Sequence, residues 1–109
     1  MANPEPLRGE IWDVHLPGIG LHPAVVLSVN ALNSRLGHVA VIPITGTRGP
    51  DATHIPLAAE AGLSRYDESY ADITGLRPVA RSSCRKRRGL VHRSELAHLE
   101  RQLRTYLGL

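Results

Sequence analysis

Short apolar segments separated by glycine and proline fill most of this 109-residue chain, and no other feature of the sequence limits the fold as strongly. Apolar runs of roughly four to eight residues between such turn residues are typical of β-strands. Only the final segment shows the three- and four-residue spacing of an amphipathic helix. The pattern therefore predicts one domain, residues 1–109, that is mainly β with a C-terminal helix: a small, strongly curved and mostly antiparallel barrel.

The alternation of apolar and polar residues locates the expected strands. Trp12 falls on the inner side of the first strand, and the third strand is apolar on both faces and therefore central, with Pro43 near an edge or a bulge. Pro23 is the first residue of the second strand, so His22 lies in the turn before it. The expected strands are residues 10–16, 23–29, 38–45, 53–57, 70–73 and 77–80; residues 58–68 are expected to be a loop or hairpin tip, and residues 85–88 a basic turn.

The C-terminal segment predicts a helix of about three to four turns. Ser94 is a suitable N-cap, and Glu95 lies in the first turn, where a carboxylate interacts favourably with the helix dipole. Gly108 follows the last periodic residue and is expected to end the helix. The apolar stripe that should face the sheet consists of Leu96, Leu99, Leu103 and Tyr106 or Leu107.

Arginine dominates the charged residues and leaves two interpretations open. The formal net charge is +3, and twelve of the 13 basic residues are arginine. Arginine binds phosphates through two donors and stacks on bases, which favours a nucleic-acid partner, but GC-rich coding also favours arginine.

Cys84 is the single cysteine, and the six histidines lack metal-ligand spacing, so we expect no disulfide, metal or cofactor. Without a signal peptide or a membrane-spanning run, we expect a cytoplasmic protein with no membrane contact.

Five polar residues stand at the ends of apolar segments, where a curved sheet can bring them together: His22, Thr45, Arg48, Asp72 and Arg77. RNA cleavage by the internal 2′-hydroxyl needs a base, an acid for the leaving 5′-oxygen and a donor that stabilises the charged phosphorane. These residue types can supply all three. The structural alternatives stay open: a surface-loop histidine, a strand-end threonine and a turn-capping Asp72 that binds Thr74 or Gly75.

Four segments follow one another along the chain: RGEIWDVHL at 8–16, HPAVVLSVNALN at 22–33, VAVIPITGTRG at 39–49 and SELAHLERQLRTYLGL at 94–109. In order and spacing, they resemble the MazF/PemK family of toxin endoribonucleases. The resemblance covers nearly the whole chain. It implies a small SH3-like β-barrel of the CcdB/PemK/MazF type that forms a homodimer. It also implies metal-independent, sequence-selective cleavage of single-stranded RNA to 2′,3′-cyclic phosphate and 5′-hydroxyl ends, and an antitoxin protein as partner.

The resemblance assigns roles to particular residues. Thr45 matches the active-site threonine of the family, and Asp72 lies where some members have an acidic catalytic residue. Arg77 lies near the basic residue that follows it, and Arg8 belongs to the opening motif; both are expected to bind RNA. His22 stands where the family has a catalytic arginine. Because imidazole both accepts and donates protons near neutral pH, we expect His22 to act as general acid or base.

Arg48 or Arg77 would then supply the positive charge that the missing arginine provides in the family. The loop between the first two strands is also shorter than in the family, at about residues 17–21, and covers less of the RNA groove. Three functions therefore remain open. The chain is an active endoribonuclease, a weak or inactive barrel that binds RNA or an antitoxin, or a CcdB-like protein that inhibits gyrase.

Overall fold

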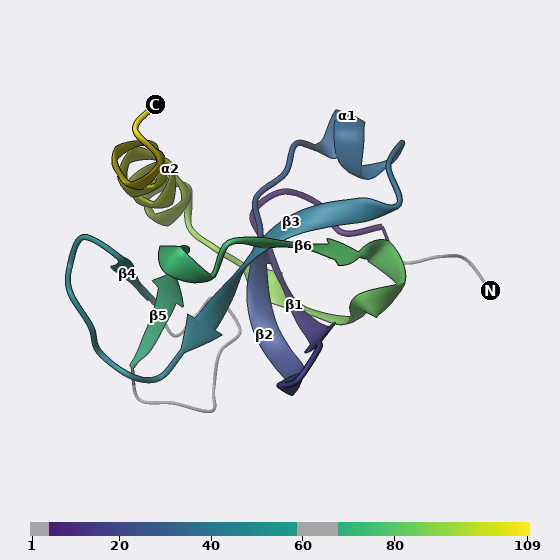
Figure 1. Ribbon diagram of the computed structural model, residues 1–109, viewed down its shortest axis with the longest axis horizontal. Coiled ribbons are helices and arrows are strands. Elements are labelled where there is room, and N and C mark those ends of the chain that lie inside the picture. Colours follow the sequence, from purple (N-terminus) through teal and green to yellow (C-terminus); the bar gives the residue numbers. More distant parts are fainter. Residues whose placement is uncertain (1–4, 59–67) are drawn as a thin grey trace.

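The computed structural model describes residues 5–58 and 68–109, which form one curved, antiparallel sheet and a C-terminal helix (Figure 1). The strands follow the order β4-β5-β3-β2-β1-β7, and β6 also pairs with β3. The elements are β1 (Glu10–Leu16), β2 (Gly20–Val26), α1 (Asn30–Asn33), β3 (His38–Thr45), β4 (His54–Leu57), β5 (Ser69–Asp72), η2 (Ile73–Gly75), β6 (Arg77–Ala80), η3 (Arg81–Ser83), β7 (Cys84–Leu90) and α2 (Arg93–Leu107). This confirms the predicted class. Within the described residues, the edge strands β4 and β7 do not pair, so hydrogen bonds do not close the sheet into a barrel.

The strand β3 is central, as predicted, because it pairs with three other strands. β2 pairs along one of its edges, and on the other edge β6 pairs with the first half of β3 while β5 pairs with its last two residues. Pro43 lies between these two pairings, at a position that neither β5 nor β6 contacts by backbone pairing. A residue without an N–H is tolerated there, because no ladder hydrogen bond is lost.

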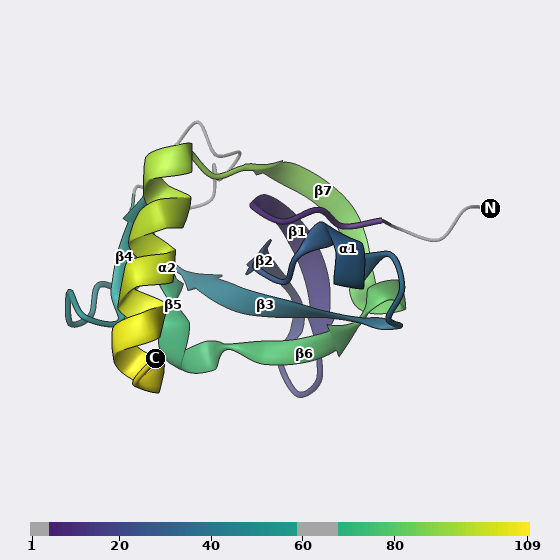
Figure 2. The same ribbon diagram turned by 90° about the horizontal axis from the view of Figure 1, so that it is seen from above.

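The buried side chains form two groups on the two faces of the sheet. We call the group between the sheet and α2 the helix core; it is rich in leucine and isoleucine and includes Ile42, Ile44, Ile55 and Leu99, all fully buried. We call the other group the valine core; it contains Val14, Leu16, Ala24, Val26, Val39, Val41, Val79 and Cys84. Figure 2 shows α2 lying across β4 and β5 on one side of the molecule.

The first strand serves both cores. Trp12 is partly buried against the valine core, and its indole Nε1 donates to Glu10 at 3.0 Å. The prediction that Trp12 faces inward is therefore confirmed. Ile11, on the opposite face, is also fully buried, because it packs in the helix core. A simple inside–outside alternation fails for β1 since both of its faces contact apolar side chains.

The second strand differs from the prediction at both ends. It begins at Gly20, which pairs with Leu16, so Pro23 is an interior residue of β2 and His22 belongs to the strand rather than to the turn. Pro23 is tolerated because the ladder with β3 starts at the next residue. The strand ends at Val26, whereas the prediction extended to Val29, which is exposed.

The predicted basic turn at residues 85–88 is wrong, because these residues form most of β7, an edge strand that pairs with β1. Edge strands tolerate charged side chains, so charge alone does not indicate a turn. The predicted N-cap Ser94 is also wrong. The helix α2 begins at Arg93, and Glu95 accepts a hydrogen bond from the backbone N–H of His92 at 2.7 Å.

The remaining helix and strand predictions stand close to the structure. Gly108 ends α2 in the left-handed conformation, with φ 73°. Leu99 is fully buried and Leu96 and Leu103 are partly buried, as predicted, but Tyr106 and Leu107 are both exposed, so the apolar stripe is wrong at its C-terminal end. Most of the expected loop at 58–68 lies outside the described residues. In the described part of the chain, none of the helices has the length and hydropathy needed to cross a membrane.

Candidate functional site

The pairing of β3, β4 and β5 gathers polar side chains on one face of the sheet. Thr45 pairs with Tyr70, and His54 pairs with Asp72. Residues directly opposite on antiparallel strands project to the same face, as do alternate residues along one strand. These four side chains therefore share the face opposite to Ile44, which is buried in the helix core. We call this polar face the site face.

His22 extends the site face onto β2. Its ring nitrogen Nε2 lies 2.6 Å from the backbone carbonyl oxygen of Ile44, the residue before Thr45. A carbonyl oxygen only accepts, so Nε2 carries the proton, and Nδ1 is the nitrogen that accepts a proton in the neutral ring. The surface-loop interpretation of His22 is wrong, because this side chain is half-buried within a strand.

Thr45 is the last residue of β3 and lies beside the carbonyl that His22 contacts. Its hydroxyl oxygen accepts a hydrogen bond from the backbone N–H of Thr47 at 3.1 Å, as expected of a strand-end cap. Accepting this bond leaves the hydroxyl proton available for donation. The capping role and a role toward a phosphate oxygen are therefore compatible.

Asp72 uses its two carboxylate oxygens differently. Oδ1 accepts from the backbone N–H of Thr74 at 3.1 Å and from its hydroxyl at 2.6 Å, so the turn-capping interpretation is correct for this oxygen. Oδ2 instead lies 3.9 Å from Nε2 of His54. The second oxygen remains on the site face, next to an imidazole.

Sequence reasoning missed His54 as a member of the site. Its Nδ1 lies 2.9 Å from the hydroxyl of Thr53, and its ring lies so close to Gly49 that a Cβ there would approach ring atoms to 2.5 Å. The loop that follows Thr45 thus packs directly on this imidazole. The signal in the sequence was the strand pattern at 53–57, but only its register against β5 places His54 opposite Asp72.

Arg77 lies at the start of β6, opposite Val41, and therefore on the same face of β3 as Thr45. Its Nε donates to the carbonyl of Gly75 at 2.9 Å, which turns the guanidinium back toward the turn. Gly75 packs so tightly on Pro43 that a Cβ there would lie 2.5 Å from the proline ring. The absence of a side chain at Gly75 thus sets the position of Arg77.

Arg48 reaches the site through Tyr70, the partner of Thr45. Its Nε donates to the phenol oxygen of Tyr70 at 3.1 Å, and its guanidinium lies 3.3 Å from Glu68. The hydrogen bond with Tyr70, together with the charge of Glu68, raises the pKa of Arg48. The side chain remains mostly exposed, so it is accessible to a ligand.

Arg8 is not brought to the site. Its guanidinium forms an ion pair with Glu100 of α2 at 3.1 Å and donates to the carbonyl of Leu27. Leu27 follows the end of β2, five residues and roughly 16 Å along the strand from His22. In the structure, Arg8 ties α2 to this far end of β2, and its RNA-binding role stays a prediction.

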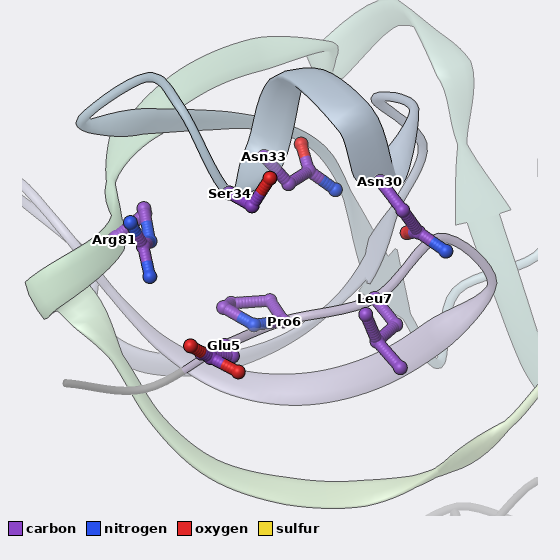
Figure 3. Close-up of a pocket in the computed structure, with 7 residues that line it drawn as sticks. All are labelled: Glu5, Pro6, Leu7, Asn30, Asn33, Ser34 and Arg81. Carbon is purple, nitrogen blue, oxygen red and sulfur yellow. The ribbon is translucent and has the colours of Figure 1, made fainter. Parts of the chain in front are cut away.

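A small cavity of about 50 Å³ lies apart from the site face (Figure 3). Figure 3 shows side chains from the N-terminal segment, from α1 and from the segment between β6 and β7 around it. The lining residues are Glu5, Pro6, Leu7, Asn30, Asn33, Ser34 and Arg81. Ligand pockets usually enclose about 300–1,000 Å³, so this cavity is too small for a nucleotide.

The fold agrees with the comparisons to known proteins. The chain belongs to the family of PemK-like, MazF-like toxins of type II toxin–antitoxin systems, whose family model matches residues 7–107. This match spans all the strands and α2.

Solved structures of similar fold include two mycobacterial proteins. An endoribonuclease from a mycobacterial species has a TM-score of 0.83 at 23% identity, covering 96% of this chain and 93% of that one. An endoribonuclease in complex with its cognate antitoxin, also mycobacterial, has a TM-score of 0.85 at 24% identity, covering 95% and 96%. A MazE–MazF complex from Deinococcus radiodurans has a TM-score of 0.81 at 23% identity, covering 95% and 97%.

Proposed function

We propose that this toxin is an endoribonuclease that cleaves single-stranded RNA at selected sequences. The reaction is attack of a 2′-hydroxyl on the adjacent phosphorus, with departure of the 5′-oxygen and no metal ion. The products are a 2′,3′-cyclic phosphate and a 5′-hydroxyl end. The observation that carries the proposal is the 2.6 Å contact of His22 Nε2 with the carbonyl of Ile44, which holds an oriented imidazole beside Thr45.

The contact supports Nδ1 as the atom of His22 that would exchange a proton. Because Nε2 keeps its proton toward the carbonyl, Nδ1 takes up the 2′-hydroxyl proton when the ring is neutral, or protonates the leaving 5′-oxygen when the ring is charged. Oδ2 of Asp72, the oxygen that Thr74 does not use, is the second proton-transfer group on the same face. The two groups together satisfy the requirement for one base and one acid.

Charge stabilisation falls to the remaining side chains. The hydroxyl of Thr45 donates to a phosphate oxygen, and the guanidinium of Arg77 stabilises the negative charge that develops on the phosphorane. Arg48 contributes a second positive charge from the rim of the site, where Tyr70 orients it. Each of these roles is consistent with the placement of the side chain on the site face.

We also propose an antitoxin protein as partner and a homodimer as the working assembly. Structures of similar fold include toxins bound to an antitoxin. At the C-terminal end of α2, Tyr106, Leu107 and Leu109 are exposed, an apolar group that suits a subunit contact. Monomeric behaviour in light scattering at micromolar concentration would contradict the dimer.

The experiment is incubation of the pure protein with a long RNA in EDTA, followed by mapping of the cuts and their end groups. We expect cyclic-phosphate ends at recurring short sequences.

His22→Ala should lower kcat by about 10²–10⁴-fold, the usual contribution of a proton-transfer group. His22→Arg should also lower kcat, because the guanidinium stays protonated and cannot accept the 2′-hydroxyl proton. His38→Ala, which changes an exposed histidine at the start of β3, is the matched control.

Two results would overturn the proposal. Full activity of His22→Ala would remove His22 from the chemistry. Intact RNA with the wild-type protein would reject the ribonuclease, and inhibition of gyrase in the same preparation would favour the CcdB-like alternative.

A further inference from the structure

The edge strand β7 carries four consecutive cations, at residues 85–88, all of them exposed. At about 3.3 Å per residue, they extend over roughly 10 Å. Among the described residues, β7 pairs with β1 alone, so its other edge is not covered by a strand. A basic strand in this position presents its charge to solvent.

The four cations differ in their contacts. Arg87 Nε lies 2.5 Å from Glu10, and Arg88 lies 3.7 Å from Asp13, so these two have carboxylate partners on β1. No ion pair within residues 5–58 and 68–109 involves Arg85 or Lys86. Lys86 lies opposite Asp13 in the register with β1, whereas Arg85 has no register partner there, so Arg85 is the less neutralised of the two cations. An external anion near both side chains would reduce their mutual repulsion.

The register of the sheet places the start of β7, next to Arg85, in the same row as His22. Val14 of β1 pairs with His22 on one side and with Cys84 on the other, so the three residues form one row across three strands. At about 4.8 Å between neighbouring strands, Cys84 lies roughly 10 Å from the backbone of His22. Arg85 follows Cys84 directly, and Figure 2 shows β7 beside β1. A few nucleotides of single-stranded RNA can span this distance.

We propose that Arg85 and Lys86 bind the phosphate backbone of substrate RNA outside the cleaved sequence. The inference rests on the proposed function, because it takes RNA at the site face as the anchored ligand. Contacts to phosphate carry no base information, so this surface increases the affinity for long RNA without selecting the cut site. Arg87 and Arg88, which are engaged with Glu10 and Asp13, contribute less.

The test measures binding rather than cleavage. The probes are 2′-O-methyl oligonucleotides of about five and about 20 nucleotides, which lack the attacking hydroxyl, titrated at several salt concentrations. For the long probe, the Arg85→Gln/Lys86→Gln variant should reduce the slope of log K against log[salt] by about 1.4, at roughly 0.7 per phosphate contact on a single strand. Its affinity at low salt should fall by about tenfold, and the short probe should show a much smaller loss.

The matched control is Arg35→Gln/Arg101→Gln, which removes the same charge from exposed positions elsewhere. Equal losses in both variants would reduce the effect to net charge and overturn the inference. An unchanged salt slope in the β7 variant would also overturn the inference. If the variant loses binding to a polyglutamate peptide but keeps binding to RNA, the surface belongs to a protein partner and the inference is again overturned.

The charge-reversal variant Arg85→Glu is a second test, for the case in which the double substitution has only a small effect. Reversal replaces a positive charge by a negative one and should therefore weaken binding of the long probe further than neutralisation does. Thermal unfolding checks that each variant is folded. Because the probes cannot be cleaved, absence of ribonuclease activity in the wild type would reject the proposed function while leaving this binding measurement interpretable.

Discussion

The two faces of the central strands differ in what covers them. On the helix-core face, α2 packs on large aliphatic side chains such as Ile44. On the other face, the valine core fills the curve of the sheet, and beyond it the ends of β3 and β5 carry Thr45 and Asp72, both partly exposed. Of these two adjacent residues of β3, Ile44 thus contributes to packing and Thr45 belongs to the candidate site. Substitutions on the two faces should separate stability from activity.

The largest expected effect is on the helix-core face. Leu99 is fully buried at the centre of the contact between α2 and the sheet. Leu99→Ala leaves a cavity and should lower the free energy of unfolding by about 2–5 kcal/mol, measured by urea denaturation. Tyr106→Ala, at a half-exposed position of the same helix, should change it by less than about 1 kcal/mol. Comparable losses in the two variants would show that α2 is not held through this face.

Gly75→Ala should affect both stability and the site. The added Cβ would approach the Pro43 ring to 2.5 Å, and neither the ring nor the paired strand can yield easily. We expect a loss of about 1–3 kcal/mol in unfolding free energy, as for overpacking. RNA cleavage by the folded protein should also fall, because Arg77 is held through this turn. Gly37→Ala, which adds its Cβ in open space, is the control; equal behaviour of the two variants would refute the steric argument.

The lowered pKa of Glu10 predicts how the free energy of unfolding changes at acid pH. Burial alone would raise its pKa, but hydrogen bonds from Trp12, from the backbone of Leu7 and from Arg87 outweigh burial and lower the pKa below its ordinary 4.5. The native state therefore binds fewer protons than the unfolded state near and below pH 4.5. The stabilisation is present above that pH and is lost as the pH falls through the native pKa.

In denaturant titrations, Glu10→Gln should lower the unfolding free energy at pH 7 by about 1–3 kcal/mol, since it removes a charge-assisted hydrogen bond to Arg87. The difference from wild type should shrink on acidification. A difference that stays constant between neutral pH and pH ~3 would contradict the assignment of this pH dependence to Glu10.

The sequence predicted those parts of the fold in which local pattern and tertiary environment agree. β3 and β6 have the predicted bounds, because apolar strand residues between turn residues also lie inside the sheet. β7 was missed because the charges of an edge strand resemble those of a turn. Pro23 was placed at a strand end, since the sequence does not show that β3 begins to pair one residue later.

The same limit applies to the site. The sequence pattern indicated His22, Thr45 and Asp72 as candidate site residues, and the structure places them on one face of the sheet. The sequence did not indicate His54, because its place on the site face depends on the register of β4 against β5. The isolation of Arg8 depends on an ion pair with Glu100, almost the whole chain length away in sequence. Contacts between distant segments are set by packing, which the periodicity of one segment does not encode.

Cys84 gives the smallest expected effect and reports on the valine core. Burial raises the pKa of its thiol to about 11, against a partial lowering by the positive charge of Arg81. Between its ordinary pKa of 9.0 and about 11, the unfolded thiol ionises while the native thiol does not, so stability falls as the pH rises through this window. The free energy of unfolding of Cys84→Ala should therefore depend less steeply on pH in this window.

A thiol reagent at pH ~8 should modify Cys84 only in urea, because the native thiol is neutral and buried. Fast modification of the native protein would show that the valine core opens readily, whereas the helix core, probed by Leu99, is expected to open only with global unfolding.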